Sequence, residues 1–156
     1  MSDIQTEADI GFGTSLWMGD GATPEVFTEV MVELTDVNPP EITAGTTDAT
    51  HHKAPNRFRQ RIATLRDTSE VPISGHLVRN DPAIASLRAK VGARGYTSYQ
   101  IRIPPTEEGG DDGEIHEFAA LATGFAQTSP LEDRMMWTLT LQPSGGVDVS
   151  AGPVTP

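Results

Sequence analysis

The sequence predicts a mainly β protein, an antiparallel β-sandwich or barrel with one flanking α-helix at about residues 82–91. Two observations support this prediction. Apolar residues alternate with polar ones in several stretches that are separated by turns rich in Gly and Pro, which is typical of half-buried strands. Start and stop signals for a helix occur together at one place only. The chain has 156 residues and no cysteine, so we expect one domain with an ordinary core and no disulfide.

The N-terminal region combines a polar segment with the first predicted strand. Residues 1–15 lack a sustained pattern and predict a flexible N-terminal arm that carries Asp3, Glu7 and Asp9. After a turn cluster at residues 19–25, period-two alternation over residues 26–35 predicts one long strand. It ends before two consecutive prolines, because proline cannot donate to a strand ladder.

The next segment predicts a long basic loop over residues 41–68. It has little apolar content and no steady period after a candidate short strand at residues 41–44. Loops of this length within a compact domain are more often functional or disordered than idle. Its cations are candidate contact residues: Lys53, Arg57, Arg59, Arg61 and Arg66.

The helix prediction rests on local signals that follow an alternating strand at residues 71–77. Asp81 is a good N-cap, and Pro82 fits the first helical position. Apolar residues then recur at helical spacing, and a glycine stands where the helix should stop. These residues are Ile84, Leu87, Val91 and Gly92.

Three further strands are predicted in the C-terminal half. Tyr99, Ile101 and Ile103 form the inward face of the first, and a Gly-rich acidic hairpin loop follows at residues 106–114. The apolar stretch 115–125 changes phase near residues 119–120, which predicts a β-bulge. Residues 135–142 alternate most regularly and are expected to end at residues 144–146. The predicted domain therefore spans residues 16–146, with a loose C-terminal tail over residues 147–156.

The charge distribution divides the chain into acidic, basic and acidic segments. Ten of its eleven cations lie between residues 53 and 102, whereas that window holds three of its 22 acids. Such a chain is a candidate for binding copies of itself, because a positive patch on one subunit can meet a negative patch on the next. The net charge of −11 argues against a general nucleic-acid binder. No apolar stretch predicts a signal peptide or a membrane span.

The order of these segments resembles the major tail-tube protein of long non-contractile-tailed bacteriophages, the lambda-like siphophage group. The resemblance covers residues 13–146 and rests on an ordered set of motifs, none of them specific alone. They are Gly19-Asp20-Gly21, Pro24-Glu25-Val26-Phe27, Thr47-Asp48, Leu65-Arg66-Asp67, Asp81-Pro82, the run from Tyr99 to Pro104, Leu131-Glu132-Asp133 and Ser144-Gly145. Some members carry an extra immunoglobulin-like domain, for which we expect no room here.

The resemblance implies a structural virion protein that is made in the bacterial cytoplasm and ends up in the tail. Six subunits would close into a ring, and rings would stack into a tube around a tape-measure protein and join other tail proteins. DNA would pass through the tube without specific binding. The segments 41–68 and 1–15 would become ordered on stacking. An acidic bore is also implied, and Glu29 and Glu33 are its candidate residues.

Other interpretations stay open at this point. The cations of the loop also fit a solvated surface, and Glu29 with Glu33 also fits the solvated face of a sheet. A tail terminator or completion protein would share the fold but form one ring only. A ligand- or carbohydrate-binding β-sandwich is a third possibility. No catalytic motif is present, and the pair His51-His52 has no acid at a familiar ligand offset, so we predict no enzyme, metal or cofactor.

Overall fold

The computed structural model describes residues 13–30, 32–105, 110 and 112–152. Strands dominate this part of the chain, and its one α-helix is short. The elements are β1 (Ser15–Gly19), β2 (Phe27–Glu29), β3 (Glu33–Val37), β4 (Ile42–Asp48), the 3-10 turn η1 (Pro55–Arg57), β5 (Arg61–Thr68), β6 (Val71–His76), α1 (Pro82–Ala89), β7 (Thr97–Ile103), β8 (Gly113–Thr128) and β9 (Met136–Gly152). The predicted mainly β class with one flanking helix is therefore confirmed.

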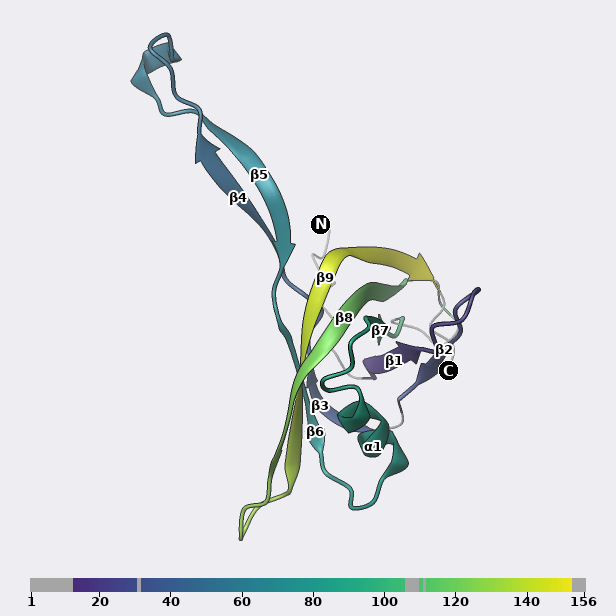
Figure 1. The fold of residues 1–156 in the computed structure, drawn as a ribbon. Coiled ribbons are helices and arrows are strands. Elements are labelled where there is room, and N and C mark those ends of the chain that lie inside the picture. The colour runs from purple at the N-terminus through teal and green to yellow at the C-terminus, as the bar shows by residue number, and fades with distance from the viewer. Residues whose placement is uncertain (1–12, 31, 106–109, 111, 153–156) are drawn as a thin grey trace, which may run out of the picture.

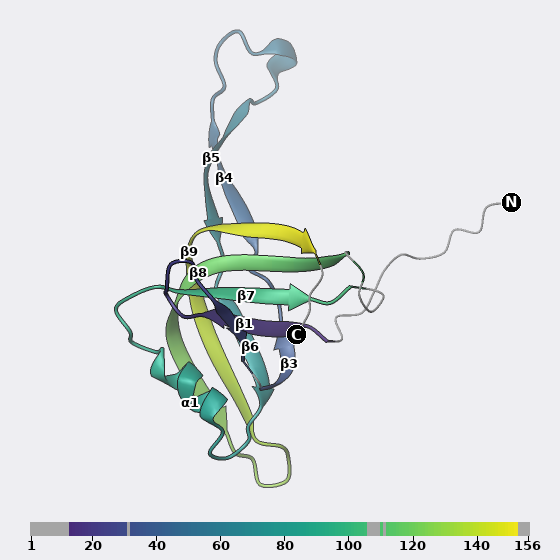
Figure 2. The same ribbon diagram turned by 90° about the vertical axis from the view of Figure 1, so that its right-hand side faces the viewer.

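Seven strands form one antiparallel sheet in the order β2-β1-β7-β8-β9-β6-β3. The long strands β8 and β9 hold its two halves together. The first part of β8 pairs with β7, and the first part of β9 pairs with β6. Register shifts after Glu117 and after Ala122 interrupt the β8–β9 ladder, and such bulges bend strands. The bent sheet crosses over itself (Figure 2). It ends in two edge strands, β2 and β3, and so does not close into a barrel.

The core lies inside this bend. Alternate residues of β6, β7 and β9 point into it, as the period-two patterns predict, and Trp137, Tyr99 and Leu139 are fully buried. The helix α1 contributes Ile84 and Leu87 to the same core. It begins as predicted, because the Asp81 carboxylate accepts a hydrogen bond from the backbone N–H of Ala83 at 3.0 Å.

The segment predicted as a long basic loop is instead a β-hairpin that projects from the sheet (Figure 1). β4 and β5 pair with each other and form a separate two-stranded sheet. We call residues 42–68 the arm. Only residues 49–60 connect its strands. Of these strands, the period-two pattern predicted only a short piece at residues 41–44, which overlaps the start of β4. The rest was missed because every residue of β4, and every residue of β5 except Thr68, is exposed, so no buried apolar face marks the two strands.

Two strand boundaries also differ from the prediction. The long strand expected over residues 26–35 is divided into β2, which pairs with β1, and β3, which pairs with β6. Between them the backbone N–H of Val32 donates to the carbonyl of Val30 at 2.9 Å, a local bond that no strand ladder contains. β9 continues to Gly152, so a loose tail from residue 147 is wrong over residues 147–152. Gly145 lies within β9, and its φ of +85° is one that glycine adopts readily. The pairing of β8 with β9 therefore continues on both sides of this residue.

Candidate assembly surfaces

The end of the arm concentrates positive charge. Residues 49–61 contain Lys53, Arg57, Arg59 and Arg61 and no acid. All four side chains are exposed, as is Arg66 nearer the root of the arm. The structure thus brings the five predicted cations onto one projecting hairpin, and the part of the chain described here gives none of them an ion pair.

Hydrogen bonds give the end of the arm a defined shape. The Asp48 carboxylate accepts bonds from the Thr50 hydroxyl and from the Thr50 backbone N–H, the latter at 2.8 Å. The Thr50 hydroxyl in turn accepts from the backbone N–H of Gln60 at 3.0 Å. The Thr50 hydroxyl, and then its N–H, hold the pKa of Asp48 below the ordinary value for aspartate, because both bonds favour the charged form.

Apolar side chains are also exposed along the arm. Ile62 and Leu65 of β5 are 56% and 89% exposed, and Phe58 before that strand is 72% exposed. Large apolar side chains exposed close to charged ones are typical of protein contact sites. A two-stranded hairpin without a covered apolar face is marginally stable by itself. The arm therefore has the composition of a surface that another polypeptide covers.

A second surface lies on the outward face of the sheet, opposite the core. One ladder position runs across five neighbouring strands, because each residue in it pairs with the next. The row is Glu29, Trp17, Gln100, Glu117 and Asp148, from β2 through β1, β7 and β8 to β9. It places three acids in line on one face. Sequence reasoning missed Glu117 and Asp148, because the row exists only once the strands are in register.

A single arginine lies within this row of acids. The Arg102 guanidinium stacks 3.8 Å from the centre of the Trp17 ring and donates two hydrogen bonds to the Gln100 side-chain oxygen at 2.9 and 2.7 Å. Gln100 itself donates to Glu117 at 3.3 Å. Partial burial lowers the pKa of Arg102, and the negative charge of Glu29 opposes that shift. Glu29 is thus half-buried beside a cation.

The other predicted residues are not gathered here. Glu33 was expected on the same strand as Glu29, but it begins β3 at the opposite edge of the sheet, where it pairs with His76. Asp3, Glu7 and Asp9 lie outside the described residues, and their role stays a prediction. Within the described ranges no cluster of three or more metal-ligating side chains occurs, and α1 is too short to cross a membrane.

Comparisons with known proteins bear on this fold. No family model and no curated protein sequence matches this chain. Among solved structures, a chain in the tail of an empty gene transfer agent particle, refined with C6 symmetry, has 14% identity and a TM-score of 0.63, and the match covers 87% of this chain and 96% of that one.

Two other similar structures come from assemblies that terminate a tube. A chain of the anti-feeding prophage tube-terminating cap has 12% identity and a TM-score of 0.69, with 97% of each chain covered. A chain of the sheath/tube terminator in an extracellular contractile injection system has 10% identity and a TM-score of 0.70, covering 96% of this chain and 100% of that one. At these identities the likeness concerns the fold, and this chain therefore has a fold found in tail and tube-terminating assemblies.

Proposed function

We propose that this protein is a tail-tube subunit of the long non-contractile, lambda-like siphophage type. Six copies close into a ring, rings stack into a hollow tube, and DNA leaves through the tube. The fold shared with chains of tail assemblies, one of them refined with C6 symmetry, supports the structural role. The siphophage type rests on the ordered motifs of the sequence.

The observation that carries this proposal is the arm. Its strands pair only with each other, its apolar side chains are uncovered, and its end has a charge of +4. Since the whole chain has a net charge of −11, the remaining residues sum to −11 − 4 = −15. The basic end of the arm is therefore attracted to the acidic parts of an identical copy. We assign the arm to the contact between successive rings.

The outward acidic row fits the wall of the bore. Carboxylates repel phosphate, so DNA would slide past Glu29, Glu117 and Asp148 without the counterion-releasing contacts that hold nucleic acid on basic proteins. Trp17 and Gln100, which lie between Glu29 and Glu117 in the row, carry no charge. Glu33, the second acid predicted for the bore, lies on the other half of the sheet, and its place in the bore remains a proposal.

Assembly on a template follows from the same features. Covering the arm offsets the free-energy cost of ordering it, and a single copy cannot supply that cover. The edge strands β2 and β3 present unpaired backbone groups, which neighbours in a ring would pair. The resemblance to the tail-tube family adds a tape-measure protein and other tail proteins as partners, assembly in the host cytoplasm, and a final location in the virion tail, and we include these in the proposal.

Charge reversal on the arm tests the proposal. In R57E/R59E/R61E the monomer should fold normally, because the three side chains are exposed, whereas electron microscopy should find no elongated tubes. R57Q/R59Q/R61Q carries side chains of the same length as glutamate but without its charge, and should lose elongation only in part. Arg94 is an exposed cation outside the arm, so Arg94→Glu should form tubes that lengthen normally. Normal tubes from R57E/R59E/R61E would refute the stacking role.

A second candidate is a terminator protein that forms one ring and stops. Two of the similar structures come from terminating assemblies, with TM-scores of 0.69 and 0.70. Images of the purified protein at rising concentration separate the candidates. Tubes with a regular repeat support a tube subunit, and single rings that never lengthen support a terminator.

A further inference from the structure

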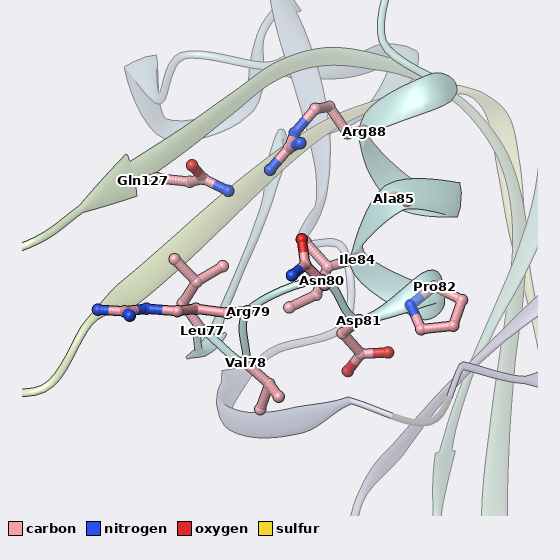
Figure 3. A pocket seen from close by; sticks show the side chains of 10 residues that line it. All are labelled: Leu77, Val78, Arg79, Asn80, Asp81, Pro82, Ile84, Ala85, Arg88 and Gln127. Carbon is pink, nitrogen blue, oxygen red and sulfur yellow. The ribbon is translucent and has the colours of Figure 1, made fainter.

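A cavity of about 540 Å³ lies beside α1, between the loop that leads into the helix and the end of β8 (Figure 3). Leu77, Val78 and Ile84 give it an apolar wall. Two arginines, Arg79 from the loop and Arg88 from the helix, also line it. We call it the helix pocket. It is therefore a hollow of mixed lining, with an apolar wall on one side and two arginines among its polar residues.

The two arginines are available to a ligand with negative charge. Neither forms an ion pair with any residue that the structure describes. Arg88 lies over the Phe125 ring, 5.3 Å from its centre, which fixes the side chain without neutralising it. The acid at the pocket, Asp81, is engaged as the helix cap through the backbone N–H of Ala83. The pocket thus favours an apolar side chain flanked by carboxylates.

The hairpin tip between β8 and β9 has that composition. Leu131 is 99% exposed, and Glu132 and Asp133 beside it are exposed too. The Asp133 carboxylate accepts the backbone N–H of Arg134 at 2.7 Å, and the Arg134 guanidinium lies 3.5 Å from the His76 ring nitrogen. The arginine thus lies against the body of the molecule, and the apolar and acidic residues extend outward. Because Leu131 is fully exposed, the pocket of its own chain does not hold it.

We propose that the tip of one copy docks in the helix pocket of its neighbour in the ring. Leu131 packs against the apolar wall, and Glu132 and Asp133 pair with Arg79 and Arg88. The partner surfaces differ, so the contact is head-to-tail, the kind that closes rings. This proposal rests on the proposed function, because that function makes the two copies neighbours in a ring. Figures 1 and 2 show the tip and α1 on the side of the sheet body away from the arm, with the tip extending beyond the helix. If the arm points along the tube axis, both lie toward the same end of the ring, where a tip can reach the next copy.

Charge exchange between two variants tests the pairing. R79E/R88E has an acidic pocket and an acidic tip, and E132R/D133R has a basic pocket and a basic tip. Each alone should raise the protein concentration needed for ring formation by at least about tenfold, because like charges then face each other. An equal mixture should restore rings, since each tip then meets a pocket of opposite charge. Circular dichroism of each variant confirms folding. Failure of the mixture, with both variants folded, would overturn the proposal.

Cysteine cross-linking supplies a test that does not depend on charge. The chain has no cysteine, so Leu131→Cys and Val78→Cys each introduce a unique thiol. The two variants are made with tags of different length, so that a mixed dimer can be recognised by its size. When they are mixed under mild oxidation, they should form a disulfide between one copy of each. Leu131→Cys mixed with Tyr96→Cys, whose exposed position lies outside the pocket, should form at least about tenfold less, because disulfides need Cα atoms within about 7 Å.

The two proposals fail in different ways. Mixed disulfides without tubes would support the docking contact and refute the tube. Tubes without mixed disulfides would support the tube and refute the docking contact. Equal cross-linking of both cysteine pairs would indicate random collision and also refute the contact.

Discussion

The sheet body and the arm are both built from antiparallel strands, but they differ in what stabilises them. The body contains all fourteen buried apolar residues that form the core cluster of the described chain. In the arm, only Thr68 at the root is buried among the residues of β4 and β5. The same backbone pattern therefore gives a self-sufficient unit in one region and an unfinished one in the other. The difference indicates that the arm acquires its buried surface from another molecule.

The largest expected effect concerns the interior of the body. Trp137 is fully buried, stacks on Phe125 at 5.8 Å between ring centres, and donates to the His76 carbonyl at 3.1 Å. Trp137→Ala should lower the free energy of unfolding by about 3–5 kcal/mol. Leu65→Ala on the arm, where the leucine is 89% exposed, should change it by less than about 0.5 kcal/mol. Urea unfolding checks both, and similar losses would abolish the distinction between the two regions.

A smaller loss is expected where two body elements meet without room for a side chain. A Cβ at Gly75 would overlap the Glu33 carbonyl and lie 2.9 Å from Cζ2 of Trp137. Gly75→Ala should therefore cost about 1–3 kcal/mol in unfolding free energy. Gly124→Ala in β8, with nothing within 4 Å of its Cβ, is the matched control. If the two variants unfold at the same urea concentration, the close packing of β3, β6 and β9 is refuted.

The arm should respond to apolar-to-charged changes in assembly and hardly at all in stability. In I62D/L65D the melting temperature of the monomer should stay within the small range of surface variants, while tube growth by light scattering should be lost. Tyr96→Asp places one carboxylate at a 59% exposed position outside the arm and should leave growth intact. Growth of I62D/L65D at the normal rate would mean that no partner covers these side chains.

The smallest effect concerns pH at the end of the arm. Bonds from Thr50 lower the pKa of Asp48. The carboxylate therefore stabilises the turn above the ordinary aspartate value of about 3.9, and that contribution is lost as pH falls through the lowered pKa. Carboxyl carbon shifts in an NMR titration should give an Asp48 midpoint below that value. Thr50→Ala should raise the midpoint only part of the way, because the Thr50 N–H bond remains. An unchanged midpoint would refute the hydroxyl contact.

The same contrast explains what the sequence could predict. Strands β6, β7 and β9 were predictable because one face of each is buried, so Ile73, Ile101 and Leu139 alternate with polar residues. The helix was predictable from Asp81 and Pro82, whose capping chemistry is local. The strands of the arm were not, because solvent contacts both faces and selects no period. The predicted loop boundaries nevertheless enclose the arm, since its cations are recognisable by composition.

Long-range pairing limited the prediction of the candidate sites. The five cations were found because they are close in sequence. Glu117 and Asp148 were missed, because only the register of β8 with its neighbours brings them into line with Glu29. Likewise, Glu29 and Glu33 were assigned to one strand, because the sequence does not show that β2 pairs with β1 whereas β3 pairs with β6. In each case the missing information lies in contacts between distant segments.

The central claim is that copies of this chain cover the arm of one another, and hydrogen exchange tests it most directly. Backbone amides of β4 and β5 should exchange rapidly in the free monomer and become protected when tubes form. Amides of β7 and β9 should be protected in both states and serve as the internal reference. If tubes form while the amides of β4 and β5 exchange as fast as in the monomer, the arm is not the assembly surface and the account is wrong.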